Sequence, residues 1–317
     1  EDASGKKYFD FAHLGEIVRI AVKFLDRVID INYYPTPTAA ASNRAWRPVG
    51  LGQMGLQDTF FQLGLPFDSP EARELSTRIQ EDIYYHALST SCALAEARGP
   101  HPSFLMTRAA KGELQFDLWR VKPPVSKRWS ELKERVAKVG LRNSLLLAIA
   151  PTATISSIAG CYECIEPQLS NLFKRETLSG DFLVINRYLV ADLESRGLWT
   201  ERIRELIKRA EGSIQDIDEI PEDVRLLYRT VWELPMRSLV DMAAARGPYL
   251  DQSQSLNLFI ETPTNPTLQL TDISAASDAA HRSGVVVAVV SDASVALVVL
   301  LTESRSCGFW PPTRSVT

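Results

Sequence analysis

The sequence predicts an α/β protein in which helices alternate with short buried strands. Two long segments, residues 11–31 and 69–98, place apolar side chains at the spacing of an amphipathic helix. A run of six apolar residues, 145–150, is bounded by Asn143-Ser144 and Pro151 and is short enough for a buried strand. Because segments of both kinds alternate along the chain, we expect a partly parallel sheet flanked by helices.

The first helical segment ends before Pro35 and Pro37. The positions expected to form its buried stripe are Phe11, Leu14, Ile17, Val18, Ala21, Leu25, Val28 and Ile29. The next helix carries clearer signals: Ser69 is suited to the N-cap, Pro70 to the first turn, and Gly99-Pro100 to the end. Its expected buried face holds Leu75, Ile79, Ile83 and Ala87.

Four further segments complete the expected element order. Residues 129–139 and 201–210 have helical periodicity, and residues 182–185 and 256–260 are short apolar runs that suit strands. From about Thr267 the sequence becomes rich in Ala, Val and Ser and contains no Lys. Its apolar runs, 285–290 and 295–301, suit either buried strands or aggregation-prone segments.

Composition excludes several classes of protein. Hydrophobic residues make up 45% and charged residues 23%, with a formal net charge of −4 and no basic stripe, so we expect no nucleic-acid partner. No apolar stretch is long enough to span a membrane, and the charged start has no signal-peptide core. Four cysteines (Cys92, Cys161, Cys164 and Cys307) are too few for a disulfide framework, which favours a cytoplasmic location. The chain has no initiator methionine, so we expect a fragment of a longer protein.

Gly50, Gly52 and Gly55 match the G-x-G-x-x-G fingerprint of dinucleotide-binding proteins. Pro48 spoils the strand that should precede such a fingerprint, and no strand with a terminal acid follows at the required distance. We therefore expect no dinucleotide site here. The glycines should instead lie at a helix start and allow neighbouring helices to approach closely.

Cys161 and Cys164 form a C-x-x-C pair, but no second pair or thioredoxin-like unit accompanies them. Two small buried residues explain the pattern better than a redox or zinc site. Glu163 and Glu166 flank the pair, and we assign them no catalytic role because Pro167 makes a shared helix face doubtful.

The segment from Pro151 to Ser157 is the strongest candidate site. It follows the apolar run 145–150 and is dense in Thr and Ser. A strand that turns into a helix start there would expose unpaired backbone N–H groups beside hydroxyl groups, and such groups bind phosphate. From spacing alone, an ordinary helix cap is the favoured explanation of the segment.

Seven short motifs within residues 8–265 resemble the large subunit of class I ribonucleotide reductase. In chain order they are DINYYP (30–35), RPVGLG (47–52), GLRNS (140–144), PTATIS (151–156), IEP (165–167), LSGDF (178–182) and DQSQSLN (251–257). The resemblance implies the second half of a ten-stranded α/β barrel with flanking helices. It also implies that Thr152, Ala153, Thr154, Ile155 and Ser156 bind the substrate phosphates, chiefly through backbone N–H groups. Ile155 stands where some relatives have a hydroxyl residue, so that side-chain bond is absent here.

The resemblance further implies reduction of ribonucleoside diphosphates by thiyl-radical chemistry for DNA synthesis. The family's radical cysteine lies in an Asn-x-Cys-x-Glu motif, which is absent from this chain, so we expect no catalytic residue, metal or cofactor here and no activity of the fragment alone. The implied partners are a small subunit with a dinuclear metal radical centre and a second copy of the complete large subunit. An allosteric, ATP-binding N-terminal region would lie outside the chain.

Two alternatives remain open: an adenosylcobalamin-dependent ribonucleotide reductase and a non-catalytic nucleotide-binding module.

The resemblance fades after about Pro266, and no tyrosine occurs after Tyr249, although the family has a Tyr-Tyr pair near this end. We therefore divide the chain into residues 1–266, the C-terminal half of the barrel domain, and residues 267–317, a divergent tail or the product of a frame change.

Overall fold

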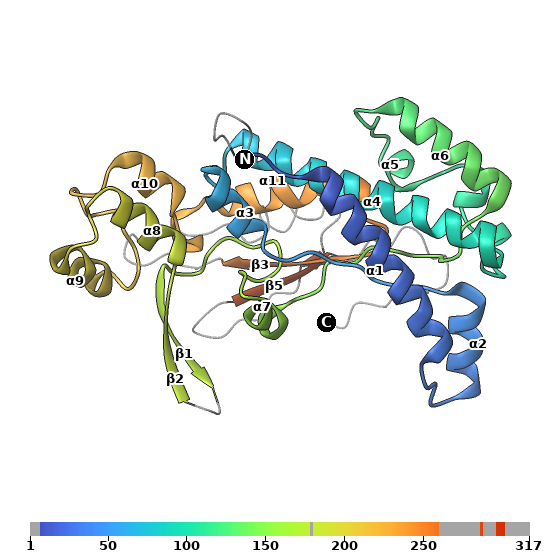
Figure 1. Ribbon diagram of the computed structural model, residues 1–317, viewed down its shortest axis with the longest axis horizontal. Helices are drawn as coiled ribbons and strands as arrows, with labels where there is room; N and C mark the ends of the chain where they lie inside the picture. Colours follow the sequence, from blue (N-terminus) through green and yellow to red (C-terminus); the bar gives the residue numbers. More distant parts are fainter. Residues whose placement is uncertain (1–6, 178–179, 260–285, 288–295, 302–317) are drawn as a thin grey trace, which may run out of the picture.

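The computed structural model describes residues 7–177, 180–259, 286–287 and 296–301 (Figure 1). Its α-helices are α1 (Phe11–Ile31), α2 (Pro37–Trp46), α3 (Leu56–Leu63), α4 (Pro70–Arg98), α5 (Gln115–Leu118), α6 (Ser126–Val139), α7 (Ala153–Ala159), α8 (Arg187–Ser195), α9 (Glu201–Arg209), α10 (Glu222–Leu227) and α11 (Met236–Arg246). Short 3-10 helices are η1 (Phe104–Met106), η2 (Ala109–Lys111), η3 (Val231–Glu233) and η4 (Gly247–Tyr249). The strands are β1 (Leu172–Thr177), β2 (Gly180–Ile185), β3 (Gln254–Phe259), β4 (Val286–Val287) and β5 (Ala296–Leu301).

The long helix α4 confirms the capping signals of its sequence. The Ser69 hydroxyl accepts a hydrogen bond from the backbone N–H of Ala72 (3.1 Å), Pro70 occupies the first turn, and Gly99 ends the helix at a φ of 83°. Ile79 and Ile83 are buried as predicted. Because α4 contacts α1, α6 and α11, it forms the centre of the larger hydrophobic core.

The buried face of α1 differs from the prediction. Val18, Val22 and Ile29 are buried, whereas Ile17 and Val28 are about half exposed. The reason lies in α4: the His86 ring packs against Gly15, where an added Cβ would lie only 2.4 Å from it. This close contact fixes the rotation of α1 about its own axis. Helical periodicity alone does not distinguish two buried faces that differ by one residue.

Three extended segments meet at the centre of the molecule. Segment 145–150 pairs in parallel with residues 49–51 through the Leu51–Leu147 bridge, and with β3 through the Ile149–Gln254 bridge. Only isolated bridges form there, because the N–H groups of Leu146 and Leu147 donate to the carboxylate of Asp251 (2.8 and 2.7 Å) instead of to a neighbouring strand. The predicted strand is therefore extended and buried but lacks a continuous ladder.

The remaining pairings are antiparallel among the residues that the structure describes. β1 and β2 form a hairpin that projects from the lower left of Figure 1. β5 lies between β3 and β4, with Gln254 opposite Leu301 and Phe259 opposite Ala296. β4 and β5 fall in the two apolar runs of the tail, while the rest of residues 267–317 lies outside the described residues.

The three glycines lie just before helix α3. Gly55 precedes α3 at a φ of 79°, which agrees with the predicted helix start. The close neighbour of Gly50 and Gly52 is the extended segment 145–150 and not a helix, so that part of the prediction is wrong. A Cβ on Gly52 would lie 2.7 Å from the backbone oxygen of Ala148, which explains why only glycine fits there.

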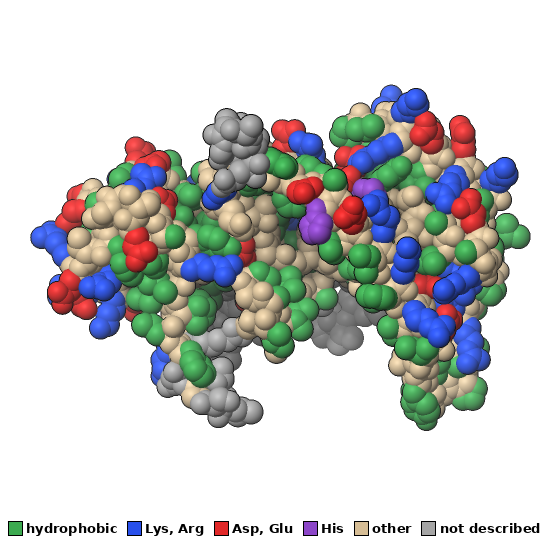
Figure 2. Space-filling view, viewed as in Figure 1, with side chains coloured by type: hydrophobic (Ala, Val, Ile, Leu, Met, Phe, Trp, Pro, Cys, Tyr) green, Lys and Arg blue, Asp and Glu red, His purple; other side chains and the backbone are tan. Residues whose placement is uncertain are grey.

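A second, smaller core joins the helices at one end of the molecule (Figure 1). α8, α9 and α10 bury Leu189, Leu193, Ile207 and Val224 around Phe61 of α3. In the view of Figure 2, Lys and Arg side chains are interspersed with Asp and Glu across the molecule. None of the helices in the described part of the chain combines the length and the apolar character needed to cross a membrane.

Candidate functional site

The predicted phosphate segment is a turn that leads directly into helix α7. Thr152 is the N-cap, and the backbone N–H of Ser156 donates the first helical hydrogen bond to the Thr152 carbonyl (2.9 Å). Ala153, Thr154 and Ile155 are exposed in the first turn of α7, where the backbone N–H groups of Thr154 and Ile155 have no partner within the helix. The structure thus brings the predicted residues together at an accessible helix start.

Hydroxyl groups contribute less to this surface than the sequence suggests. The Thr152 hydroxyl accepts a hydrogen bond from the backbone N–H of Cys164 (2.7 Å) and does not cap its own helix. Ser156 is only 3% exposed, and its hydroxyl donates to the carbonyl of Ala153 (3.3 Å). Ile155 is 54% exposed and has no hydroxyl to offer. Thr154 therefore presents the exposed hydroxyl among the five predicted residues.

A second set of contacts holds the turn before α7 in place against the rest of the fold. The Cys164 thiol lies 3.4 Å from the carbonyl oxygen of Ala150, and the backbone N–H of Cys161 donates to Ser156 (3.1 Å). Asp58 of α3 in turn accepts a hydrogen bond from the backbone N–H of Tyr162 (2.6 Å). Sequence reasoning missed Asp58, because its partner lies 104 residues further along the chain.

Of the C-x-x-C pair, Cys164 is buried as the sequence predicts, whereas Cys161 is only partly buried. Cys164 is 2% exposed, and burial raises the pKa of its thiol to about 11. Cys161 is half-buried, and burial followed by the nearby Asp58 carboxylate raises the pKa of its thiol too. Both thiols therefore stay protonated near neutral pH, and a protonated thiol is a poor nucleophile and metal ligand.

A cavity of about 460 Å³ adjoins the inner side of α7. Its lining includes Ala153, Ser157, Asp58, Glu163, Tyr162 and Arg187. Burial raises the pKa of the Tyr162 phenol strongly, and its oxygen accepts a hydrogen bond from the backbone N–H of Leu169 (2.7 Å). Tyr162 is thus a neutral structural group in the cavity wall and not a proton donor at physiological pH.

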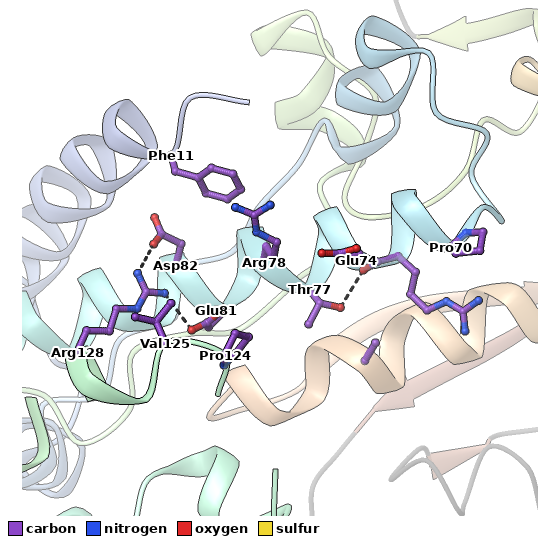
Figure 3. A pocket seen from close by; sticks show the side chains of 12 residues that line it. Phe11, Pro70, Glu74, Thr77, Arg78, Glu81, Asp82, Pro124, Val125 and Arg128 are labelled. Atoms are coloured by element: carbon purple, nitrogen blue, oxygen red, sulfur yellow. Dashed lines mark hydrogen bonds and ion pairs between the residues drawn. The ribbon is translucent and has the colours of Figure 1, made fainter. Parts of the chain in front are cut away.

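The larger cavity, about 660 Å³, lies between α4, the start of α1 and the segment before α6 (Figure 3). Its charged side chains neutralise one another: Arg128 forms ion pairs with Asp82 (2.8 Å) and Glu81 (3.0 Å). Arg78 lies over the Phe11 ring, 4.8 Å from its centroid. Because Arg128 is already paired with two carboxylates, this cavity is a weaker candidate for an anionic ligand than the turn before α7.

Metal ligation has no visible basis in the described ranges, where no group of three or more His, Cys, Asp or Glu side chains converges. Among the described residues, the exposed turn before α7, with its backbone N–H donors, is therefore the strongest candidate for a ligand site.

A family model described as "Ribonucleotide reductase, barrel domain" matches residues 2–289. The chain belongs to this family. The matched region confirms the predicted barrel class, and it extends beyond the expected domain boundary at residue 266.

Curated relatives agree with this membership of the ribonucleotide reductase family. The ribonucleoside-diphosphate reductase large subunit of Caenorhabditis elegans is 47% identical over 259 residues, and that of Arabidopsis thaliana is 47% identical over 260 residues. Each match covers 82% of this chain but only 33% and 32% of the relative, so the chain spans about a third of their length. The α subunit of a class Id ribonucleotide reductase from Actinobacillus ureae has a similar fold, with a TM-score of 0.60 at 24% identity over 77% of this chain and 40% of that one.

Proposed function

We propose that this chain supplies the substrate phosphate-binding turn of a ribonucleoside-diphosphate reductase large subunit. The observation that carries the proposal is the exposed first turn of α7, fastened by the hydrogen bond between Cys164 and the Thr152 hydroxyl. Thr152, Ala153, Thr154, Ile155 and Ser156 form this turn. Its backbone N–H groups and the partial positive charge of the helix start suit a diphosphate.

The family in which the chain lies supports a proposal for the activity of the whole protein. We propose that the complete subunit reduces ribonucleoside diphosphates in the cytoplasm by thiyl-radical chemistry. Its partners would be a second large subunit and a small subunit that carries a dinuclear metal radical centre. The relatives' names support this class over an adenosylcobalamin-dependent enzyme, because they are large subunits of ribonucleoside-diphosphate reductases.

The 317-residue chain itself should bind without turnover. It lacks an Asn-x-Cys-x-Glu motif, so no cysteine in it matches the family's radical cysteine. Cys92 and Cys164 are also fully buried. We therefore expect no deoxynucleotide from the chain when it is mixed with a competent small subunit and a ribonucleoside diphosphate. Measurable product would contradict this expectation.

The binding proposal is tested by calorimetric titration of the chain with inorganic pyrophosphate. Thr154→Pro removes one backbone N–H of the turn and should weaken binding by about tenfold or more, because it removes a donor and distorts the turn. Thr154→Ala keeps the backbone N–H and serves as the matched control, with a smaller loss. Equal affinity of a folded Thr154→Pro variant and the unmodified chain would overturn the assignment.

A further inference from the structure

Helix α1 has an apolar stripe on the side that faces solvent. Five large side chains at helical spacing form this outer stripe: Ile17, Ile20, Phe24, Val28 and Ile31. Each is between 48% and 69% exposed, whereas Val18, Val22 and Ile29 on the opposite side are buried in the larger core. In the view of Figure 1, α1 crosses the near face of the molecule, and Figure 2 shows apolar side chains on that face.

The outer stripe is narrow and continuous. At 3.6 residues per turn, its five members fall within an arc of about 80° and extend over about 21 Å of helix. Ile17, Phe24 and Ile31 are spaced by seven residues, as in the seam of a coiled coil. Single apolar side chains on a surface need no explanation, but a contiguous row is typical of an interaction site. The outer stripe therefore suits a second α-helix.

The charges beside the outer stripe match a second copy of the same helix. Glu16 and Arg27 are both exposed and lie on the same flank of the stripe. When two copies of α1 lie antiparallel, with Ile20 of each opposite Phe24 of the other, Glu16 of each copy lies opposite Arg27 of the other. Two-fold symmetry makes this pair occur twice. A parallel arrangement would instead place the charged flank against the apolar flank that holds Leu14, which leaves the charges unmatched.

We propose that the 317-residue chain forms a symmetric antiparallel dimer through the outer stripe of α1. Burial of the two stripes drives association, and the two Glu16–Arg27 pairs favour the antiparallel register. Within its own chain, Glu16 has only a loose, exposed contact with His13 (3.7 Å), so pairing across the dimer breaks no buried interaction. The dimer uses no residue of the turn before α7, so the inference does not depend on the proposed phosphate-binding function.

The size of the contact indicates a weak, reversible dimer. A typical stable interface buries about 800 Å² per partner and uses about 20–30 residues a side. One helix from each copy offers fewer residues than that. We therefore expect a Kd on the order of 10–100 µM, so that monomer and dimer exchange with concentration.

The test is sedimentation-equilibrium ultracentrifugation of the 317-residue chain at concentrations from about 1 to about 300 µM, which bracket the expected Kd. The unmodified chain should pass from monomer to dimer over this range. Phe24→Glu places a charge at the centre of the outer stripe and should raise the Kd about tenfold or more. Leu105→Glu, the matched control, places the same charge on an apolar side chain that is 85% exposed and lies outside α1, so the Kd should not change. Circular dichroism verifies that each variant is folded.

A charge exchange at low salt, where screening is weak, tests the antiparallel register. Glu16→Arg alone places two arginines opposite each other, and Arg27→Glu alone places two carboxylates there, so each should raise the Kd about threefold. The double variant restores opposite charges and should recover the Kd of the unmodified chain. Non-specific association of apolar surfaces predicts no such recovery.

Three outcomes would contradict the proposed dimer. A chain that stays monomeric over the whole range would overturn it and leave the outer stripe to a partner other than a second copy. A dimer that Phe24→Glu leaves intact, or that Leu105→Glu weakens equally, would overturn the role of α1. A double variant as weak as the two single variants would overturn the antiparallel arrangement.

Discussion

Arg47 donates two hydrogen bonds to one carboxylate oxygen of Asp26, from Nε (3.1 Å) and Nη2 (2.8 Å), in a fully buried site. The same oxygen accepts a hydrogen bond from the side-chain amide of Asn143 (3.1 Å), which in turn bonds to Ser91. This network joins α1 and α4 to the start of the segment that carries the proposed phosphate-binding turn. The hydrogen bond from Arg47 lowers the pKa of the partly exposed Asp30 carboxyl, although its partial burial acts in the opposite direction.

Arg47→Met should lower the free energy of unfolding by about 3 kcal/mol, because it leaves the Asp26 carboxylate buried without its main partner. Arg98 and Arg142 lie 3.7 Å from Asp26 and limit the loss. Urea denaturation measures the change. Arg202→Met, which breaks an exposed pair, is the matched control and should leave stability nearly unchanged. Equal stability of the two variants would contradict a structural role for the network.

Asp251→Asn should destabilise the chain by about 1–3 kcal/mol. An amide has one acceptor oxygen, so only one of the N–H groups of Leu146 and Leu147 keeps a partner, and the new NH₂ group faces the other. Chemical denaturation measures the loss of stability. Hydrogen exchange should be faster at the backbone amides of Leu146 and Leu147 than at those of α4. Protection that is unchanged at both positions would show that Asp251 does not hold the segment.

Stability should fall as the pH is lowered from about 7.5 to about 5, in part through His101. Burial lowers the pKa of this histidine below its ordinary value of 6.5, although the contact of its ring with the Ala45 carbonyl opposes the shift. The unfolded chain therefore takes up a proton first, and the stability present above pH 6.5 is lost as the pH falls toward the lowered pKa.

His101→Phe should reduce this pH dependence, since a phenyl ring keeps the contacts with Trp46 and Phe104 but does not titrate. Burial also lowers the pKa of His86, so the variant should retain part of the effect. Urea midpoints at the two pH values give the comparison. An identical pH dependence in both proteins would exclude His101 as a contributor.

Deleting residues 267–317 should leave the melting temperature unchanged or higher if that segment is a frame-changed tail. The backbone of β5, which lies in this segment, pairs with that of β3, so the deletion also measures what this pairing contributes. Deleting residues 290–317 is the informative companion, because the family match ends at residue 289. If the deletion of residues 267–317 causes a cooperative loss of folding and the deletion of residues 290–317 does not, the domain boundary lies after residue 266.

Local signals in the sequence account for the helices and for part of the site. The caps of α4 act within a single turn, so Ser69 and Gly99 predict its ends without knowledge of the fold. The turn from Thr152 to Ser156 is likewise local, because a strand, a Pro and a Thr/Ser-rich helix start follow one another in the chain. The rotation of α1 was predicted less well, since it depends on the contact between Gly15 and His86.

The sequence by itself therefore determined the family, the α/β class and the residues of the candidate turn, all of which depend on neighbours along the chain. Only the tertiary structure decided that Asp251 replaces a strand partner for Leu146 and Leu147, that the Thr152 hydroxyl accepts a hydrogen bond from Cys164, and that Arg246 is buried with hydrogen bonds to Ser76 and Gln254. These properties arise from groups far apart in sequence that share one low-dielectric interior, where each donor, acceptor and charge depends on what the fold places beside it.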